Sequence, residues 1–190
     1  MSPALPILVP GDRLSLPELC AARLDGDVVE LGDAYAPTDR VETAHLRAAS
    51  IAGRLEGRRG LAFAGPSAAW IHGAGDQPPH LHEVQLTGRR VRLSASQRLL
   101  LHETPLGADH LQLGDVPVAA PARTLRDLVR WSVRRPVVYP WAVALGAVHP
   151  ELIETARALL GRPGKGSATS RAAEVLTSLE QEVAAVLRRR

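Results

Sequence analysis

The seven histidines of this 190-residue sequence could support chemistry, because imidazole nitrogens bind transition metals. His80 and His82 are spaced to lie on one side of a strand, where other histidines could approach them. The sequence has no HExxH pattern, no cysteine partner for these residues and no acidic cluster at ligand spacing. We therefore expect no metal site and no cofactor, and interpret the histidines as partly buried or surface side chains.

The candidate nucleophiles also lack the motifs that catalysis requires. Ser67 lies in the run GPSAA, which lacks the second glycine of a GxSxG elbow, so we interpret it as a helix N-cap. Cys20 stands in an acidic segment, where thiolate formation is disfavoured. The run GRPGKGS at residues 161–167 lacks the GxxxxGK[ST] pattern of a phosphate-binding loop and follows a predicted helix. We expect a protein that binds rather than catalyses; an enzyme with an unrecognised site is the alternative.

Arginine is the residue type with the most informative spacing. In a predicted helix over residues 121–131, Leu125, Leu128 and Val129 form a buried stripe, and arginines recur along the opposite edge. Arg123 is placed to pair with Asp127 at i+4, whereas the later arginines have no local partner. These cations predict a surface for nucleic acid or an acidic protein. The predicted contact residues are Arg89, Arg90, Arg92, Arg126, Arg130, Arg134 and Arg135.

Charge is distributed unevenly along the chain. Residues 1–45 hold eight acidic residues against three arginines, whereas residues 46–190 hold 20 basic residues against 12 acidic ones. An anionic partner should therefore meet the later part. Because Lys165 is the only lysine among 23 basic residues, the composition also indicates a GC-rich, actinobacterial genome. A solvated face in an arginine-biased proteome is thus the alternative to a binding surface.

Several elements must position these side chains, and their mixture predicts an α+β fold. A helix N-capped by Ser15 and a hairpin turning at residues 32–33 come first, followed by a helix that Thr38 or Asp39 caps. Segments 81–86, 90–93 and 99–103 predict consecutive antiparallel strands, and the Gly114-Asp115 turn predicts another hairpin. The other predicted strand covers residues 61–64. The other predicted helices cover residues 67–72, 121–131, 137–147, 150–160 and 167–187.

Three regions are predicted from this order: a winged-helix-like remnant at residues 1–40, a mixed α/β domain at 41–160, and a helical extension at 161–190. No segment approaches a membrane span, and residues 1–10 lack the basic region of a signal peptide. The single cysteine favours a reducing compartment. We therefore expect a cytoplasmic protein without a membrane partner, and the sequence leaves its oligomeric state open.

Two of these segments, in this order, resemble the AbiEi-type antitoxin family. The run LAFAGPSAAWIHG at residues 61–73 resembles the family's strand followed by S-A-A-x-x-H-G, and VAAPARTLRDL at residues 118–128 resembles its V-x-x-P-x-R-T-x-x-D-L segment. The β-rich interval between them, with an H-x-V-x-L stretch, is also similar. The resemblance extends over residues 28–160. Its motif residues in this chain are Ser67, His72, Gly73, Pro121, Arg123, Thr124 and Asp127.

The resemblance implies a non-enzymatic protein of a type IV toxin–antitoxin system. Family members pair with a nucleotidyltransferase-like toxin, and an N-terminal winged helix-turn-helix represses their own operon, which makes DNA a second partner. This chain departs from that pattern because one short helix precedes the hairpin, where a winged helix needs about three. Asp27, Glu30 and Asp33 also stand where the family tends to place basic residues. We therefore expect a protein-binding role, with DNA binding through the arginine-rich face as the alternative.

Overall fold

The computed structural model describes residues 6–88, 99–161 and 168–189, and its fold is α+β as predicted. Helix α1 (Leu16–Leu24) comes first, and Ser15 before it donates two hydrogen bonds to Glu18, from its backbone N–H and its hydroxyl, each 2.7 Å long. An antiparallel hairpin of β1 (Val28–Leu31) and β2 (Ala34–Pro37) follows, turning at Gly32. The helix and hairpin predicted for the N-terminus are therefore present.

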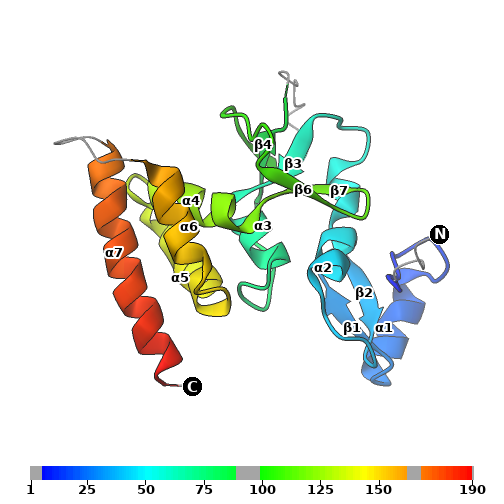
Figure 1. Ribbon diagram of the computed structural model, residues 1–190. Helices are drawn as coiled ribbons and strands as arrows, with labels where there is room; N and C mark the ends of the chain where they lie inside the picture. The colour runs from blue at the N-terminus through cyan, green and yellow to red at the C-terminus, as the bar shows by residue number, and fades with distance from the viewer. Residues whose placement is uncertain (1–5, 89–98, 162–167, 190) are drawn as a thin grey trace.

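Five strands form a second sheet in the order β5-β4-β3-β7-β6 (Figure 1). They are β3 (Leu61–Phe63), β4 (His82–Leu86), β5 (Leu99–His102), β6 (His110–Leu113) and β7 (Val116–Ala119). Strand β3 is antiparallel to β4 and parallel to β7. The predicted hairpin at Gly114 joins β6 and β7, and this glycine has the positive φ (64°) that such a tight turn favours.

Strands β4 and β5 are direct neighbours that pair in parallel. Three consecutive antiparallel strands would instead place residues 90–93 between them, so that predicted strand order is wrong. The register places His82 opposite Leu99 and Gln85 opposite His102. A parallel pair requires a crossover of about a dozen residues, which residues 87–98 are long enough to provide. The predicted strand at residues 90–93 lies outside the described residues, as does most of the glycine-rich segment at 161–166.

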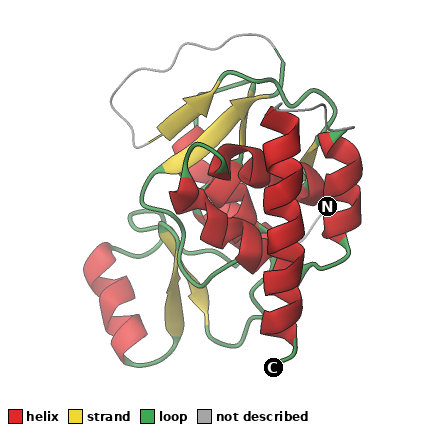
Figure 2. Ribbon diagram, turned by 90° about the vertical axis from the view of Figure 1, so that its left-hand side faces the viewer, coloured by secondary structure: helices red, strands yellow, loops and turns green. Residues whose placement is uncertain are grey.

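The remaining regular elements of the described residues are helices, and Figure 2 views them from the side of the last one. They pack in a layer beside the large sheet, with α4 contacting α3, α5, α6 and α7. Their bounds are α2 (Ala44–Ser50), the 3-10 turn η1 (Ala52–Leu55), α3 (Gly65–Ile71), α4 (Pro121–Ser132), the 3-10 turn η2 (Pro136–Val138), α5 (Tyr139–Val148), α6 (Leu152–Leu160) and α7 (Ala168–Leu187).

Two predicted helix starts are corrected by their hydrogen bonds. Thr43 caps α2 by accepting a hydrogen bond from the Leu46 N–H at 3.3 Å, because the Thr38 hydroxyl instead donates to Gly26 O and ties down the hairpin. Helix α3 begins at Gly65, ahead of Ser67, because glycine and proline suit its first positions. The Ser67 hydroxyl therefore faces a strand and does not cap the helix.

Aliphatic packing holds the elements together in two main clusters. One joins the five-stranded sheet to α2, α3 and the hairpin strands through residues such as Phe63, Trp70 and Leu31. The other joins α4 to α5, α6 and α7, with Leu128 and Leu179 both fully buried. Helix α7 thus shares its core with residues 121–160. The three-region division remains a prediction.

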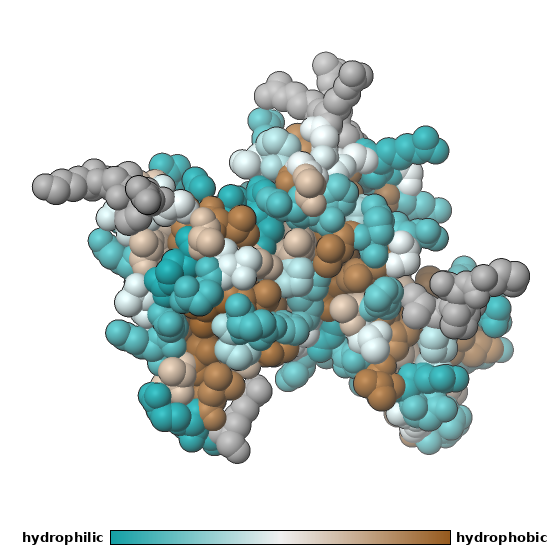
Figure 3. All heavy atoms as spheres, viewed as in Figure 1, coloured by the Kyte–Doolittle hydropathy of each residue, from teal (hydrophilic) through white to brown (hydrophobic). Residues whose placement is uncertain are grey.

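Polar residues cover most of the face in Figure 3, with smaller apolar patches between them. Among the described residues, no helix combines the length and apolarity that crossing a membrane would need.

Candidate functional site

Helix α4 presents arginines to solvent because its opposite side belongs to the core. Leu125, Leu128 and Val129 are fully buried, as the sequence predicted. The helical period then places Arg126 and Arg130 on another side of the helix. Arg130 is exposed and Arg126 half-buried. Both line a hollow that Arg134 and Arg135, in the turn after the helix, also line.

This hollow has a volume of about 640 Å³, and we call it the arginine pocket. Among the described residues, its lining contains six arginines but only one carboxylate, that of Asp127. Guanidinium groups match the planar geometry of carboxylate and phosphate oxygens, so the excess of cations favours an anionic ligand. The six are Arg123, Arg126, Arg130, Arg134, Arg135 and Arg171.

Arg171 is a member of this group that sequence reasoning missed. It lies in the first turns of α7, exposed, and reaches the pocket because α7 packs against α4. Arg171 is 37 residues beyond Arg134, and the intervening glycine-rich run carries no signal for where α7 docks. Only tertiary packing brings the two arginines together.

Two of the predicted contact arginines are held by carboxylates. The pair of Arg126 with adjacent Asp127 corrects the expectation that Arg126 has no local partner, whereas the partner of Arg135 is distant in sequence. Arg126 Nε donates to Asp127 Oδ1 at 2.9 Å. Arg135 donates to both carboxylate oxygens of Glu83, at 2.7 and 3.2 Å. Arg130 and Arg134 have no ion pair with any residue that the structure describes. The first pair therefore shapes the pocket, whereas the second pair is available to a ligand.

Glu83, on β4, organises the wall of the pocket below Arg135. It is 3% exposed and also accepts a hydrogen bond from His102 Nε2 at 2.6 Å. Burial raises the pKa of this carboxyl, but the hydrogen bonds from His102 and Arg135 outweigh it and leave the pKa below its ordinary value. The His102 ring stacks on Trp131 at 3.8 Å between centroids. Glu83 thus remains charged and fixes both neighbours.

Gly65 makes room for this wall. Its φ of +51° lies in the left-handed region, and a Cβ at this position would stand 2.5 Å from Trp131 Cζ3 and 3.0 Å from Glu83 Oε2. Any larger residue would therefore displace the Trp131 ring or the Glu83 carboxylate.

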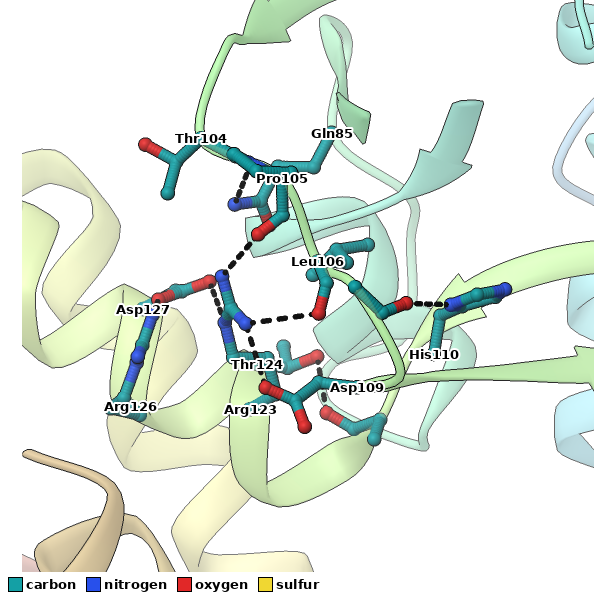
Figure 4. A network of polar contacts seen from close by, with 12 residues as sticks. Gln85, Thr104, Pro105, Leu106, Asp109, His110, Arg123, Thr124, Arg126 and Asp127 are labelled. Carbon is teal, nitrogen blue, oxygen red and sulfur yellow. Dashed lines mark hydrogen bonds and ion pairs between the residues drawn. The ribbon is translucent and has the colours of Figure 1, made fainter. Parts of the chain in front are cut away.

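Gln85 contributes an unsatisfied polar atom to the pocket. Its side chain is 1% exposed, and its Nε2 donates to Thr104 O at 3.1 Å (Figure 4). The Oε1 atom is buried and has no hydrogen-bond partner among the described residues. Buried acceptors are nearly always paired, so this atom is a place where a ligand donor would be stabilising.

Arg123 forms the network that closes one end of the pocket (Figure 4). The predicted i+4 pair is present, with Arg123 Nε donating to Asp127 Oδ2 at 2.8 Å. The same guanidinium donates to Asp109 at 2.7 Å, and to the carbonyls of Pro105 and Leu106. This side chain is 5% exposed and joins α4 to the loop before β6.

The remaining motif residues also serve the scaffold. His72, at the end of α3, hydrogen-bonds Ala119 O at 2.8 Å, so the two motif segments touch one another. Thr124 donates to Ala120 O at 3.0 Å in the first turn of α4, which Pro121 begins. Gly73 follows α3 with a φ of +102°. These contacts give the motif residues a structural explanation.

Ser67 and His82 are in contact, but both side chains are buried, unlike those of a catalytic dyad that is open to substrate. The Ser67 hydroxyl accepts a hydrogen bond from the Glu83 N–H at 3.0 Å and lies 3.2 Å from His82 Nδ1. Ser67 is 0% and His82 4% exposed, and neither lines the arginine pocket. In the described part of the chain, no group of three or more His, Cys, Asp or Glu side chains could hold a metal ion.

The other predicted contact arginines, Arg89, Arg90 and Arg92, lie outside the described residues. The candidate site therefore rests on α4, the turn after it, α7, the edge strand β5 and its neighbour β4.

Comparisons with known proteins give a distant likeness to a solved structure. No protein-family model and no curated protein matches this chain. Among solved structures, it is similar to the crystal structure of the RV2827C protein from Mycobacterium tuberculosis, with 21% identity over 92% of this chain and 69% of that chain. The TM-score is 0.42. A functional proposal must therefore start from the residues and contacts of this chain.

Proposed function

We propose that this protein is a non-enzymatic, antitoxin-like binding protein of the cytoplasm. Its partner is a nucleotidyltransferase-like toxin of a type IV toxin–antitoxin system, and an acidic surface of that partner binds at the mouth of the arginine pocket. The observation that carries the proposal is the group of Arg130, Arg134 and Arg171, which are exposed and lack an ion pair within the described residues. Free guanidinium groups can meet acidic side chains of a partner without first breaking internal pairs.

The way the motif residues are used supports binding over catalysis. Arg123, Asp127 and His72 are at least nine-tenths buried and bond to neighbouring elements. They thus fix α3 against α4, which sets the direction of the exposed arginines. A scaffold of this kind keeps the cations in place before the partner arrives, which reduces the entropy lost on binding.

The proposal predicts a nucleotidyltransferase gene beside the gene of this protein, and co-purification of the two proteins tests their binding. Replacing Arg130, Arg134 and Arg171 together with Gln should weaken the complex by about a thousandfold or more, since hydrogen bonds to charged groups contribute about 1.5–3 kcal/mol each and three arginines are changed. Co-expression of the same variant should no longer rescue growth from the toxin. The matched control replaces Arg188 and Arg189 with Gln, because Arg188 lies about 25 Å along α7 from Arg171 at 1.5 Å per residue.

Two results would contradict the proposal. The first is failure of the wild-type chain to bind the neighbouring nucleotidyltransferase. The second is equal binding by the triple variant and the control, which would remove the arginine pocket from the interface.

The net positive charge of residues 46–190 favours DNA as a second candidate partner, with a role in regulating the operon. Helix α4 is surrounded by α3, α5, α6 and α7, so it cannot enter a major groove as a recognition helix does. DNA contacts at this site would therefore be limited to phosphates. A mobility shift on the upstream region should then weaken steeply with salt and be lost in the triple variant. Absence of a shift at low salt would dismiss this candidate.

A further inference from the structure

We propose that the arginine pocket is a binding site for a small organic phosphate, a phosphate ester that also carries a hydroxyl or amino donor. The inference goes beyond the proposed function: it uses the same arginines but concerns a small ligand that the isolated chain would bind without a protein partner. Size, charge, preorganised cations and one unsatisfied acceptor each support it.

The volume of the pocket suits a small molecule. At about 640 Å³ it falls within the range of about 300–1,000 Å³ that is typical of ligand and cofactor sites. A single acidic side chain of a protein partner would fill only a small part of that space. The interior therefore has room for an entire ligand behind the arginines at the mouth.

The charge of the lining is suited to phosphate. A phosphate group presents several oxygens to donors at once, and arginine binds such groups through paired N–H bonds. Arg130 and Arg134 approach from the end of α4, and Arg171 approaches from α7. Cations that reach a pocket from different elements can surround one anion, whereas a row on a single helix cannot.

Internal ion pairs hold the adjacent arginines in place. Asp127 binds both Arg123 and Arg126, and Glu83 binds Arg135 through two hydrogen bonds. Both carboxylates are nearly fully buried and point to these partners. These ion pairs therefore keep the cations of the pocket ordered. They also neutralise much of the negative charge of Asp127 and Glu83, which reduces the repulsion between these carboxylates and a bound phosphate.

Gln85 distinguishes an organic phosphate from a simple anion. The hydrogen bond from Nε2 to Thr104 O decides the orientation of the Gln85 amide, because the flipped amide would place two oxygen acceptors, Oε1 and Thr104 O, against each other. Oε1 is therefore left as an acceptor without a donor among the described residues. A fully ionised phosphate has no hydrogen to offer this atom. A hydroxyl or amino group on the same ligand would satisfy it, which points to a sugar phosphate or a nucleotide.

Calorimetric titration of the isolated chain tests the inference with four probes: ADP, ribose 5-phosphate, tripolyphosphate and inorganic phosphate. We expect saturable binding of ADP, ribose 5-phosphate or both, and a rise in melting temperature with the ligand that binds. Binding of ADP alone would identify a nucleotide site, and binding of both would identify a site for the shared phosphate ester. Binding of neither overturns the inference.

Two variants separate the contribution of the arginines, which bind phosphate, from that of Gln85, which accepts from the ligand's hydroxyl or amino group. Arg130→Gln, a surface change that leaves the core intact, should weaken every probe that binds by about tenfold, because it removes a charge-assisted bond. Gln85→Leu should weaken the organic phosphate by about fivefold or more but leave tripolyphosphate unchanged, since only the former reaches Oε1. Arg188→Gln is the control and should change nothing.

Equal loss of ADP and tripolyphosphate binding in Gln85→Leu would show that no hydroxyl or amino group of the ligand donates to Gln85 Oε1, and would overturn that part of the inference. Unchanged ADP binding in Arg130→Gln would place the ligand elsewhere and overturn the site. Because Gln85 is buried away from a protein partner, its variant affects this inference while leaving the toxin complex intact. Titration with the small ligands and co-purification with the toxin therefore show separately whether the phosphate site or the proposed function fails.

Discussion

At the residue scale, Arg123 shows how a single side chain can link distant parts of this fold. Its guanidinium meets Asp127 within α4, and Asp109 and two carbonyls in the preceding loop. The i+4 pair could be predicted from helical spacing alone. The other partners could not, because they depend on where the loop before β6 lies relative to α4.

Replacing Arg123 with Gln should lower the free energy of unfolding by about 2–3 kcal/mol, because the buried Asp127 carboxylate loses one of its two arginine partners. Urea unfolding monitored by circular dichroism measures this loss. Arg157→Gln is the matched control: its bonds to Glu154 and Glu180 are exposed, so it should cost less than about 1 kcal/mol. Similar losses for the two variants would contradict the structural role of Arg123.

At the element scale, the close approach of α5 and α7 positions one side of the arginine pocket. A Cβ at Gly146 on α5 would stand 3.0 Å from Val183 Cγ2 and 3.3 Å from Leu179 Cδ2, both on α7. The absence of a side chain at this position lets the two helices pack closely. The docking of α7, and with it the place of Arg171, depends on this contact.

Gly146→Val should therefore overpack the α5–α7 contact and cost about 1–3 kcal/mol of unfolding free energy. We also expect faster proteolysis within α7, because the helix would lose part of its buried face. Gly53→Val is the control, since a Cβ at that position meets nothing within 4 Å. If α7 is no more susceptible to protease than in the control, the close contact does not hold it.

At the scale of the whole molecule, buried histidines couple stability to pH. Burial lowers the pKa of both His72 and His82 from the ordinary 6.5. His72 joins the two motif segments through Ala119 O, and His82 contacts Ser67 of the first segment. Protonation of these histidines would therefore disturb the contact of the sheet with α3 and α4. The unfolded chain, whose histidines are free, binds protons more readily than the native chain.

The free energy of unfolding should therefore be constant above about pH 7 and fall as pH drops below 6.5. Each histidine contributes up to about 1.4 kcal/mol per pH unit until its lower native pKa is reached. Urea unfolding at pH 7.5, 6.0 and 5.0 measures the slope. His72→Gln with His82→Asn keeps a donor or acceptor at each site and should flatten it, whereas exposed His45→Gln should not. An equally steep slope in the double variant would count against this coupling.

The sequence alone determined the local features of this protein. Spacing of apolar residues determined the buried face of α4, and turn residues located the hairpin at Gly114 and the end of α3 at Gly73. The same spacing put Arg126 and Arg130 on one side of α4. These features are predictable because each depends on residues within about one or two helical turns of one another.

Tertiary structure alone decided which distant segments meet. It set the parallel pairing of β4 with β5, and it directed Ser67 to the backbone of Glu83 instead of a helix cap. It also paired Arg135 with Glu83 across 52 residues and brought Arg171 to the pocket. Such contacts depend on the relative free energies of alternative packings of whole elements, which local spacing does not encode. The sequence thus supplied the arginines, and the packing of α7 and β4 made a pocket of them.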